Sequence, residues 1–190
     1  RQMCIRDRKY ILRLFIFAII SHFAYCFAFG INYMPFSSGN IFNQTSIMWS
    51  LAWSVVALYI INYKTNLKEW QKWLLVILIN IITFSSDWSC IAVMAILSMY
   101  SNRGNLKKQI ISMSFWIIIY AVISYLFVSK TYGLITLAVI LAYPLLNFYN
   151  GEKGKLNWMK WFFYLYYPLH LVIIGILRIT IYGNIPILFN

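Results

Sequence analysis

The sequence predicts an all-α fold, a polytopic transmembrane helical bundle of about seven spans. Its 190 residues are 62% hydrophobic and only 11% charged, whereas a soluble domain is about 45–50% apolar and about 25% charged. Apolar runs recur along the chain, many of them close to the roughly 17–25 residues that a helix needs to cross a hydrocarbon core about 30 Å thick. The basic residues gather in short clusters between these runs. These observations predict a chain that lies in a lipid bilayer.

The first two predicted spans, residues 11–30 and 45–62, are joined by a polar loop without charge. This loop, residues 31–44, contains a proline, a glycine, two serines and three asparagines, which are typical of turns and loops. Residues 1–10 are predicted to form a cytoplasmic N-terminal segment. The chain begins at Arg1 rather than at a methionine, which indicates a fragment or an altered start, and no expectation depends on its first seven residues.

The third and fourth predicted spans, residues 73–84 and 89–100, are short and are joined by the Ser-Ser-Asp-Trp turn of residues 85–88. Even when both are extended to the ends of their apolar surroundings, they reach only about 25 and 22 Å as helices. These lengths fall short of the hydrocarbon thickness. We therefore expect the turn to dip below the outer surface into a protein-lined pocket, where non-helical backbone is tolerated.

The last three predicted spans are residues 110–129, 133–149 and 161–182, and each is preceded by a basic residue. Tryptophans lie near many of the run ends, as is typical of residues at a membrane interface. The sequence contains no convincing internal repeat and no linker to a second domain. We therefore expect one transmembrane domain over residues 11–182, followed by a short outward tail, residues 183–190.

The distribution of the basic residues predicts the orientation. If the N-terminus is cytoplasmic and every run crosses once, 14 of the 16 basic residues lie on the inner side, or 12 of 14 without Arg1 and Arg6, and only Lys130 and Arg178 fall towards the outside. Cytoplasmic loops are rich in lysine and arginine. The same placement explains the net charge of +12, and it argues against a nucleic-acid partner, because nucleic-acid-binding modules lack spanning apolar runs.

Two further patterns are explained by packing alone. The three cysteines show no spacing of a metal site or disulfide framework, so neither is predicted; they are Cys4, Cys26 and Cys90. Three serines recur at every fourth residue of the second span, which gives a stripe of small side chains that lets helices approach closely; they are Ser46, Ser50 and Ser54.

His22 is the first candidate for a functional side chain, because it lies about midway along the first predicted span. Ionisable groups inside a span are costly and so are candidates for function. A histidine there could carry a proton or act as a general base, since its unperturbed pKa is about 6.5. The alternative is a neutral imidazole that hydrogen-bonds between helices, and both interpretations stay open.

Asp87 lies in the turn that is expected to dip into the bundle. A buried carboxylate at this place could orient a histidine or bind an amine. The alternative is a solvated aspartate that caps the next helix. The sequence does not decide between them.

His170 lies ten residues past Lys160, and therefore about 15 Å deep in the last predicted span. It follows a tyrosine-rich stretch with Tyr166, Tyr167 and Pro168. Both tyrosines share the helical face of His170, and the proline is typical of a kink. This cluster is the most site-like feature of the sequence, with a structural contact between helices as its alternative.

The basic loops could bind the phosphates of an anionic donor such as a nucleotide-bearing coenzyme, although the orientation rule already explains their charge. The residues considered for this role are Arg103, Lys107, Lys108, Lys153 and Lys155.

With these residues in view, the chain resembles the TraX family of membrane proteins, which is linked to acetylation of the pilin N-terminus in conjugative plasmids. The likeness rests on four segments, of which the Gly- and Lys-rich loop leading into a Tyr-Pro-x-His-Leu span is the most specific. These segments are RKYILRLFIFAIISH (8–22), SSDWSCIAVMAIL (85–97), NRGNLKKQ (102–109) and YNGEKGKLNWMKWFFYLYYPLHLVII (149–174).

The resemblance implies an acyltransferase that passes acetyl from acetyl coenzyme A, as a co-substrate, to an amine. It also implies an N-terminal truncation, because family members begin with two further spans that carry an Asp-His pair and an Arg-Leu-x-Phe-Pro stretch. The family's polar positions match Asp87, Tyr167, Pro168 and His170. At His22 the family often carries a Ser-Glu pair, so this chain departs from the pattern there.

From these features we expect a multi-pass acyltransferase of the bacterial inner membrane, with a pilin-like protein or another envelope component as acceptor. His170 would deprotonate the acceptor, Asp87 or Tyr167 would orient it, and His22 is a further candidate. One alternative is a small proton-coupled transporter, which the lack of repeated halves disfavours. Another is a non-catalytic assembly factor for pili or the envelope. The sequence does not indicate an oligomeric state.

Overall fold

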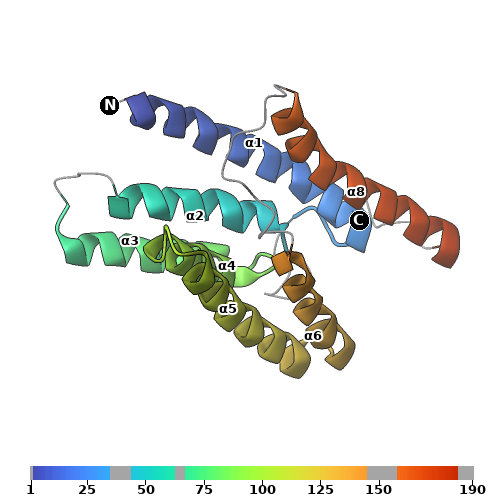
Figure 1. The fold of residues 1–190 in the computed structure, drawn as a ribbon. Coiled ribbons are helices and arrows are strands. Elements are labelled where there is room, and N and C mark those ends of the chain that lie inside the picture. Colours follow the sequence, from blue (N-terminus) through green and yellow to red (C-terminus); the bar gives the residue numbers. More distant parts are fainter. Residues whose placement is uncertain (1, 35–43, 63–66, 145–157, 184–190) are drawn as a thin grey trace. The chain divides into compact units, whose positions relative to one another are not determined.

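The fold is known from a computed structural model, which describes residues 2–34, 44–62, 67–144 and 158–183. Within these residues the chain is helical and forms no strand beyond one isolated bridge (Figure 1). The prediction of an all-α fold is therefore confirmed. The helices form two compact units, which are described separately: residues 1–90 with 156–190, and residues 91–155.

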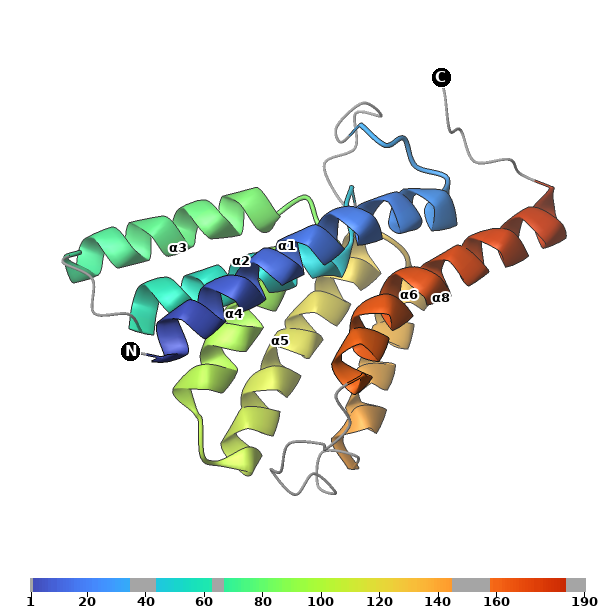
Figure 2. The same cartoon turned by 90° about the horizontal axis from the view of Figure 1, so that it is seen from above.

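The first unit is built around α1 (Gln2–Phe29). This helix packs along α2 (Ile47–Asn62) and along α8 (Met159–Tyr182), and α2 also packs on α3 (Glu69–Thr83) (Figure 2). The unit also holds the first two residues of α4 (Ser89–Ser101).

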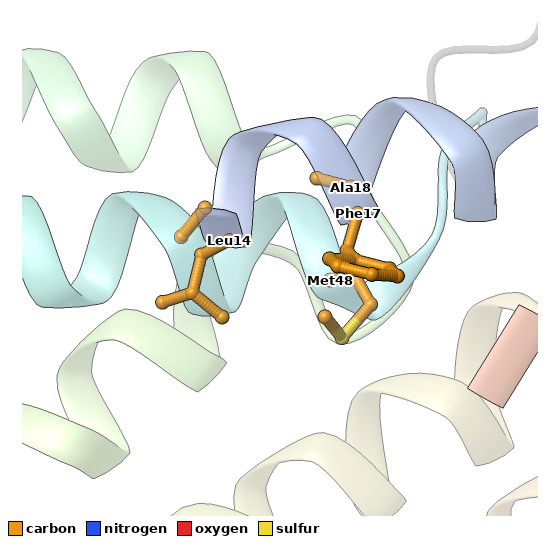
Figure 3. Packing of buried hydrophobic residues seen from close by; sticks show 5 residues of the cluster. Leu14, Phe17, Ala18 and Met48 are labelled. Atoms are coloured by element: carbon orange, nitrogen blue, oxygen red, sulfur yellow. The ribbon is translucent and has the colours of Figure 1, made fainter. Parts of the chain in front are cut away.

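One face of α1 carries the core of this unit. Leu14, Phe17 and Ala18 recur at helical spacing, which places them on one face, and they pack against Met48 and Ala52 of α2 (Figure 3). The same face continues towards the end of α1, where a second cluster joins three of its residues to α8; this cluster consists of Ala24, Tyr25, Ala28 and Leu171. Many of these side chains are small, so the helices can approach closely.

The second unit contains the rest of α4, then α5 (Leu106–Phe127), α6 (Lys130–Thr136) and the 3₁₀ helix η1 (Leu137–Ala142). Both α6 and η1 pack on α5. The run that was expected to span the membrane over residues 133–149 thus begins as a short α-helix and tightens into a 3₁₀ turn at Leu137. Its part beyond residue 144 lies outside the described residues.

Three of the described helices are long and apolar enough to cross a membrane: Lys9–Phe29, Leu106–Phe127 and Tyr164–Tyr182. Shorter apolar helices are Ile47–Asn62, Ser89–Ser101 and Lys130–Ala142. The chain is therefore a membrane protein. The count of seven crossings, the single domain and the orientation remain predictions.

Candidate functional site

Each ring nitrogen of His22, on α1, has a partner from outside that helix, and the Cys26 thiol of the same helix lies 3.7 Å from Nε2 and 3.9 Å from Nδ1. Its Nε2 lies 3.0 Å from the backbone carbonyl oxygen of Tyr33, and its Nδ1 lies 3.2 Å from the hydroxyl oxygen of Thr45. A carbonyl oxygen can only accept a hydrogen bond, so these partners assign the ring proton to Nε2. In the neutral form of the ring, Nδ1 then carries the lone pair and accepts from the Thr45 hydroxyl.

The end of α1 brings the Tyr33 carbonyl to this histidine. Gly30 adopts a φ of +66°, and the N–H of Ile31 bonds the carbonyl oxygen of Cys26 at 3.1 Å, which is the arrangement of a Schellman C-cap. The chain thereby leaves the helix and turns back over its last turns. Burial raises the pKa of the Tyr33 phenol, and the nearby Cys26 thiol raises it further, so this phenol adds no charge near His22 at neutral pH.

Thr45 also joins His22 to the turn that contains Asp87. The carbonyl oxygen of Thr45 accepts the backbone N–H of Asp87 at 2.8 Å, and the N–H of Gln44 donates to the carbonyl oxygen of Ser85 at 2.8 Å. A parallel bridge between Thr45 and Ser86 results. Ser86 is 1% exposed, and Asp87 is half-buried. The turn thus packs within the first unit, and its depth relative to the membrane surface stays a prediction.

Two residues of this turn have a left-handed backbone, Trp88 with φ +65° and Ser89 with φ +51°. Side chains larger than glycine rarely adopt this conformation, and such residues persist where the surroundings hold them. Here the Ser89 N–H bonds the Ser86 carbonyl at 2.8 Å, and the Ser89 hydroxyl bonds the Phe84 carbonyl at 2.7 Å. The backbone of the turn is therefore pinned from several sides.

One serine of the predicted stripe, Ser50 of α2, holds the same turn, a role that the sequence did not reveal. The hydroxyl of Ser50 is hydrogen-bonded to that of Ser86 and lies 3.2 Å from the Ser89 carbonyl oxygen. Ser86 in turn donates to the Thr83 carbonyl at 2.7 Å. Ser54 bonds only back to its own helix, at the Ser50 carbonyl. Spacing alone cannot distinguish a serine that packs from a serine that binds a turn.

A cavity of about 640 Å³ opens beside His22. Its walls come from α1, α2, α3 and the turn after α3, all within the first unit. The lining is apolar except for His22, Thr45 and Ser85, and it includes no charged side chain among the described residues. His22, whose Nδ1 contacts the Thr45 hydroxyl, therefore borders a space that can hold a small molecule, since such sites measure about 300–1,000 Å³.

His170 lies with tyrosines of its own helix. Its Nδ1 is 3.2 Å from the Tyr166 carbonyl oxygen, its ring stacks on Tyr166 with centroids 5.5 Å apart, and its ring meets the edge of Tyr167 at 5.1 Å. Within the described residues, these hydrogen-bond and ring contacts all come from α8. Tyr167 also packs against both apolar clusters of α1, while Pro168 is buried inside α8.

The candidate coenzyme-binding residues Arg103, Lys107 and Lys108 are exposed. They lie in the second unit around the start of α5, where the Asn105 side chain accepts the Lys108 N–H at 3.1 Å. Lys153 and Lys155 lie outside the described residues. Within the described part of the chain, no group of three His, Cys, Asp or Glu side chains could hold a metal ion.

Comparison with known proteins gives one match. The family model described as TraX protein matches residues 3–178, which is nearly the whole chain and includes His22, Asp87 and His170. No curated protein and no solved structure matches the chain.

Proposed function

Because the chain belongs to the TraX family, whose members are membrane proteins related to conjugation and pili, we propose that it is a membrane-bound acyltransferase. It passes an acetyl group from acetyl coenzyme A to an amine, such as a pilin-like N-terminus, or to another envelope acceptor. The observation that carries this proposal is the geometry of His22. Its Nδ1 carries a lone pair, its opposite nitrogen is anchored on a carbonyl, and the ring lines a cavity.

This arrangement is that of an oriented general base. An acceptor N–H or O–H in the cavity would replace the Thr45 hydroxyl as the donor to Nδ1. The acceptor atom then attacks the thioester carbonyl carbon while Nδ1 takes its proton. The new C–N or C–O bond forms, the C–S bond breaks, and the leaving thiolate of coenzyme A receives that proton. A general base of this kind contributes typically about 10²–10⁴-fold to a rate.

The other site residues have supporting roles in this proposal. The backbone N–H of Asp87 donates to the carbonyl oxygen of Thr45. The turn that contains Asp87 therefore sets the position of the Thr45 hydroxyl at His22. Arg103, Lys107 and Lys108 are exposed cations that would bind the coenzyme phosphates, since lysine and arginine form strong charge-assisted bonds with phosphate. His170 with Tyr167 stays a second candidate for the base, because its ring is only half-buried.

The experiment that tests this function measures free thiol released from acetyl coenzyme A by the purified protein in nanodiscs, with and without an acceptor amine or alcohol. We expect acceptor-dependent thiol release in amounts equal to the acetylated product. A transporter or an assembly factor would release no thiol above the rate of empty nanodiscs. That result, with the protein folded and inserted, would contradict the acyltransferase proposal.

A further inference from the structure

The cavity beside His22 combines one small polar cluster with apolar walls. His22 and Thr45 are hydrogen-bonded to each other, and Ser85 is tied to the residue before Thr45 through the Gln44 N–H. The polar groups of the lining are thus gathered in one place. The remaining lining side chains are aliphatic or aromatic.

The apolar walls face outward from the first unit. Ile19 is 54% exposed, Phe23 is 52% exposed and Ile81 is 65% exposed. Ile19 and Phe23 lie on a helix that is long and apolar enough to span a bilayer. In a bilayer, an apolar hollow beside such a helix accommodates hydrocarbon more readily than water, because water there would leave its hydrogen bonds unmade. The exposed apolar walls of the cavity therefore fit an alkyl chain.

The depth and charge of the cavity restrict the polar end of its ligand. His22 lies seven residues before the end of the span at Phe29, and so about 10 Å along the helix from that end. Among the described residues, no lysine or arginine lines the cavity, so a phosphate or carboxylate would lose its hydration without a partner. An uncharged hydroxyl or amine can donate to the Nδ1 of His22 instead.

We propose that this cavity binds a single-chain amphiphile, with its alkyl chain between α1 and α3 and an uncharged hydroxyl or amine at His22. The binding site has a consequence for the acetyl transfer proposed above, and this consequence rests on that proposed function. The acetyl acceptor is a membrane lipid with one accessible alkyl chain. In the transfer step the acceptor oxygen or nitrogen bonds to the acetyl carbon and its proton passes to Nδ1. The C–S bond of the thioester breaks, and the leaving thiolate of coenzyme A receives that proton.

The test uses a hexadecanol that carries a photoreactive diazirine on its alkyl chain. The full 190-residue protein is reconstituted in phosphatidylcholine nanodiscs. Labelled residues are identified by mass spectrometry. Adjacent isoleucines of α1 provide a matched pair, because Ile19 lines the cavity while Ile20 is similarly exposed but is not part of its lining. Ile19→Trp should fill the cavity and reduce the labelling of Phe23 and Ile81 about tenfold, as expected for overpacking. Ile20→Trp should leave it unchanged.

A second variant and three unlabelled competitors make this test decisive. Ile82→Trp, which fills the cavity from α3, should also reduce the labelling. Excess unlabelled hexadecanol should compete, whereas hexadecyl phosphate and butanol should not. Equal labelling in the Ile19→Trp and Ile20→Trp proteins, or competition by the phosphate as strong as by the alcohol, would overturn the proposal.

The binding readout separates this inference from the proposed function. His22→Gln should keep the labelled chain in the cavity, because the walls are intact, and should lose acetyl transfer. Labelling at the cavity without any thiol release would refute the transferase and leave the binding site standing. Transfer to a short soluble amine that Ile19→Trp does not affect, together with no labelling, would refute the lipid acceptor and leave the transferase standing.

Discussion

The hydroxyl of Thr45 lies 3.2 Å from the Nδ1 of His22. The carbonyl of the same threonine accepts the backbone N–H of Asp87 at 2.8 Å. Two ionisable residues from separate parts of the chain are thereby linked through one threonine at the edge of a cavity. The position of the turn after α3 and the environment of the histidine are therefore coupled.

Thr45→Val should reduce acetyl transfer about two- to tenfold, because the Thr45 hydroxyl oxygen can accept from the protonated Nδ1 that forms in the step, and a hydrogen bond of this kind contributes about 0.5–1.5 kcal/mol. The remaining contact at the Tyr33 carbonyl still holds the ring, so the activity should not vanish. Thr45→Ser keeps the hydroxyl and is the matched control. Initial rates of thiol release measure the effect, and a valine variant with the full rate would show that Thr45 does not position His22.

Ser50→Ala should destabilise the first unit by about 1–3 kcal/mol, since it leaves the buried groups at Ser86 and Ser89 without this partner. Ser54→Ala is the matched control, because Ser54 is equally buried on the same helix but bonds only to its own helix. Reversible unfolding in mixed detergent micelles compares the two. Equal losses in both variants would contradict the role of Ser50 in holding the turn.

Gly133→Ala should weaken the packing of α6 on α5. A methyl group at this position would lie 2.7 Å from the Ala121 carbonyl oxygen and 2.7 Å from the Tyr125 backbone nitrogen, so backbone has to move, at a cost of typically about 1–3 kcal/mol. Alanine is the better helix former, so helix propensity alone predicts the opposite sign. Leu134→Ala, at an exposed neighbouring position, serves as the control in the same unfolding measurement.

The predicted topology is tested by single cysteines in a background without native cysteines. Positions 68, 107 and 155 should react with a membrane-impermeant maleimide only after the cytoplasmic side is opened. Positions 87 and 190 should react from outside, with position 87 the slower of the two because Asp87 is half-buried. Equal reaction of both sets from outside would refute the model of seven crossings.

The sequence was sufficient for the helical fold, because spanning apolar runs leave few alternatives to helices in a bilayer. From the shortness of the two runs beside it, the turn around Asp87 was predicted to dip below the membrane surface. That depth stays a prediction, while the structure shows Ser86 buried and Asp87 half-buried. Thr45 could not be found in this way, since a single threonine after a polar loop carries no periodic signal. Its contact with His22 and its bridge to Ser86 both join residues far apart in the chain, and both are tertiary features.

The prominence of His170 in the sequence has a similar explanation. A Tyr-Tyr-Pro-x-His pattern stands out in an apolar run, and the structure does stack these rings on one another. The pattern cannot show which histidine borders a cavity, because a cavity is formed by residues from several helices. His22 has fewer polar neighbours in the sequence, yet it is the one whose two ring nitrogens meet partners from outside its own helix.

The most direct measurement of the central claim compares thiol release from acetyl coenzyme A by the His22→Gln and His170→Gln proteins. Glutamine keeps hydrogen bonding but cannot take up a proton, so it removes the base while leaving structural contacts in place. We expect His22→Gln to lower the rate about 10²–10⁴-fold and His170→Gln to retain most of it. An active His22→Gln protein beside an inactive His170→Gln protein would contradict the account and assign the base to His170.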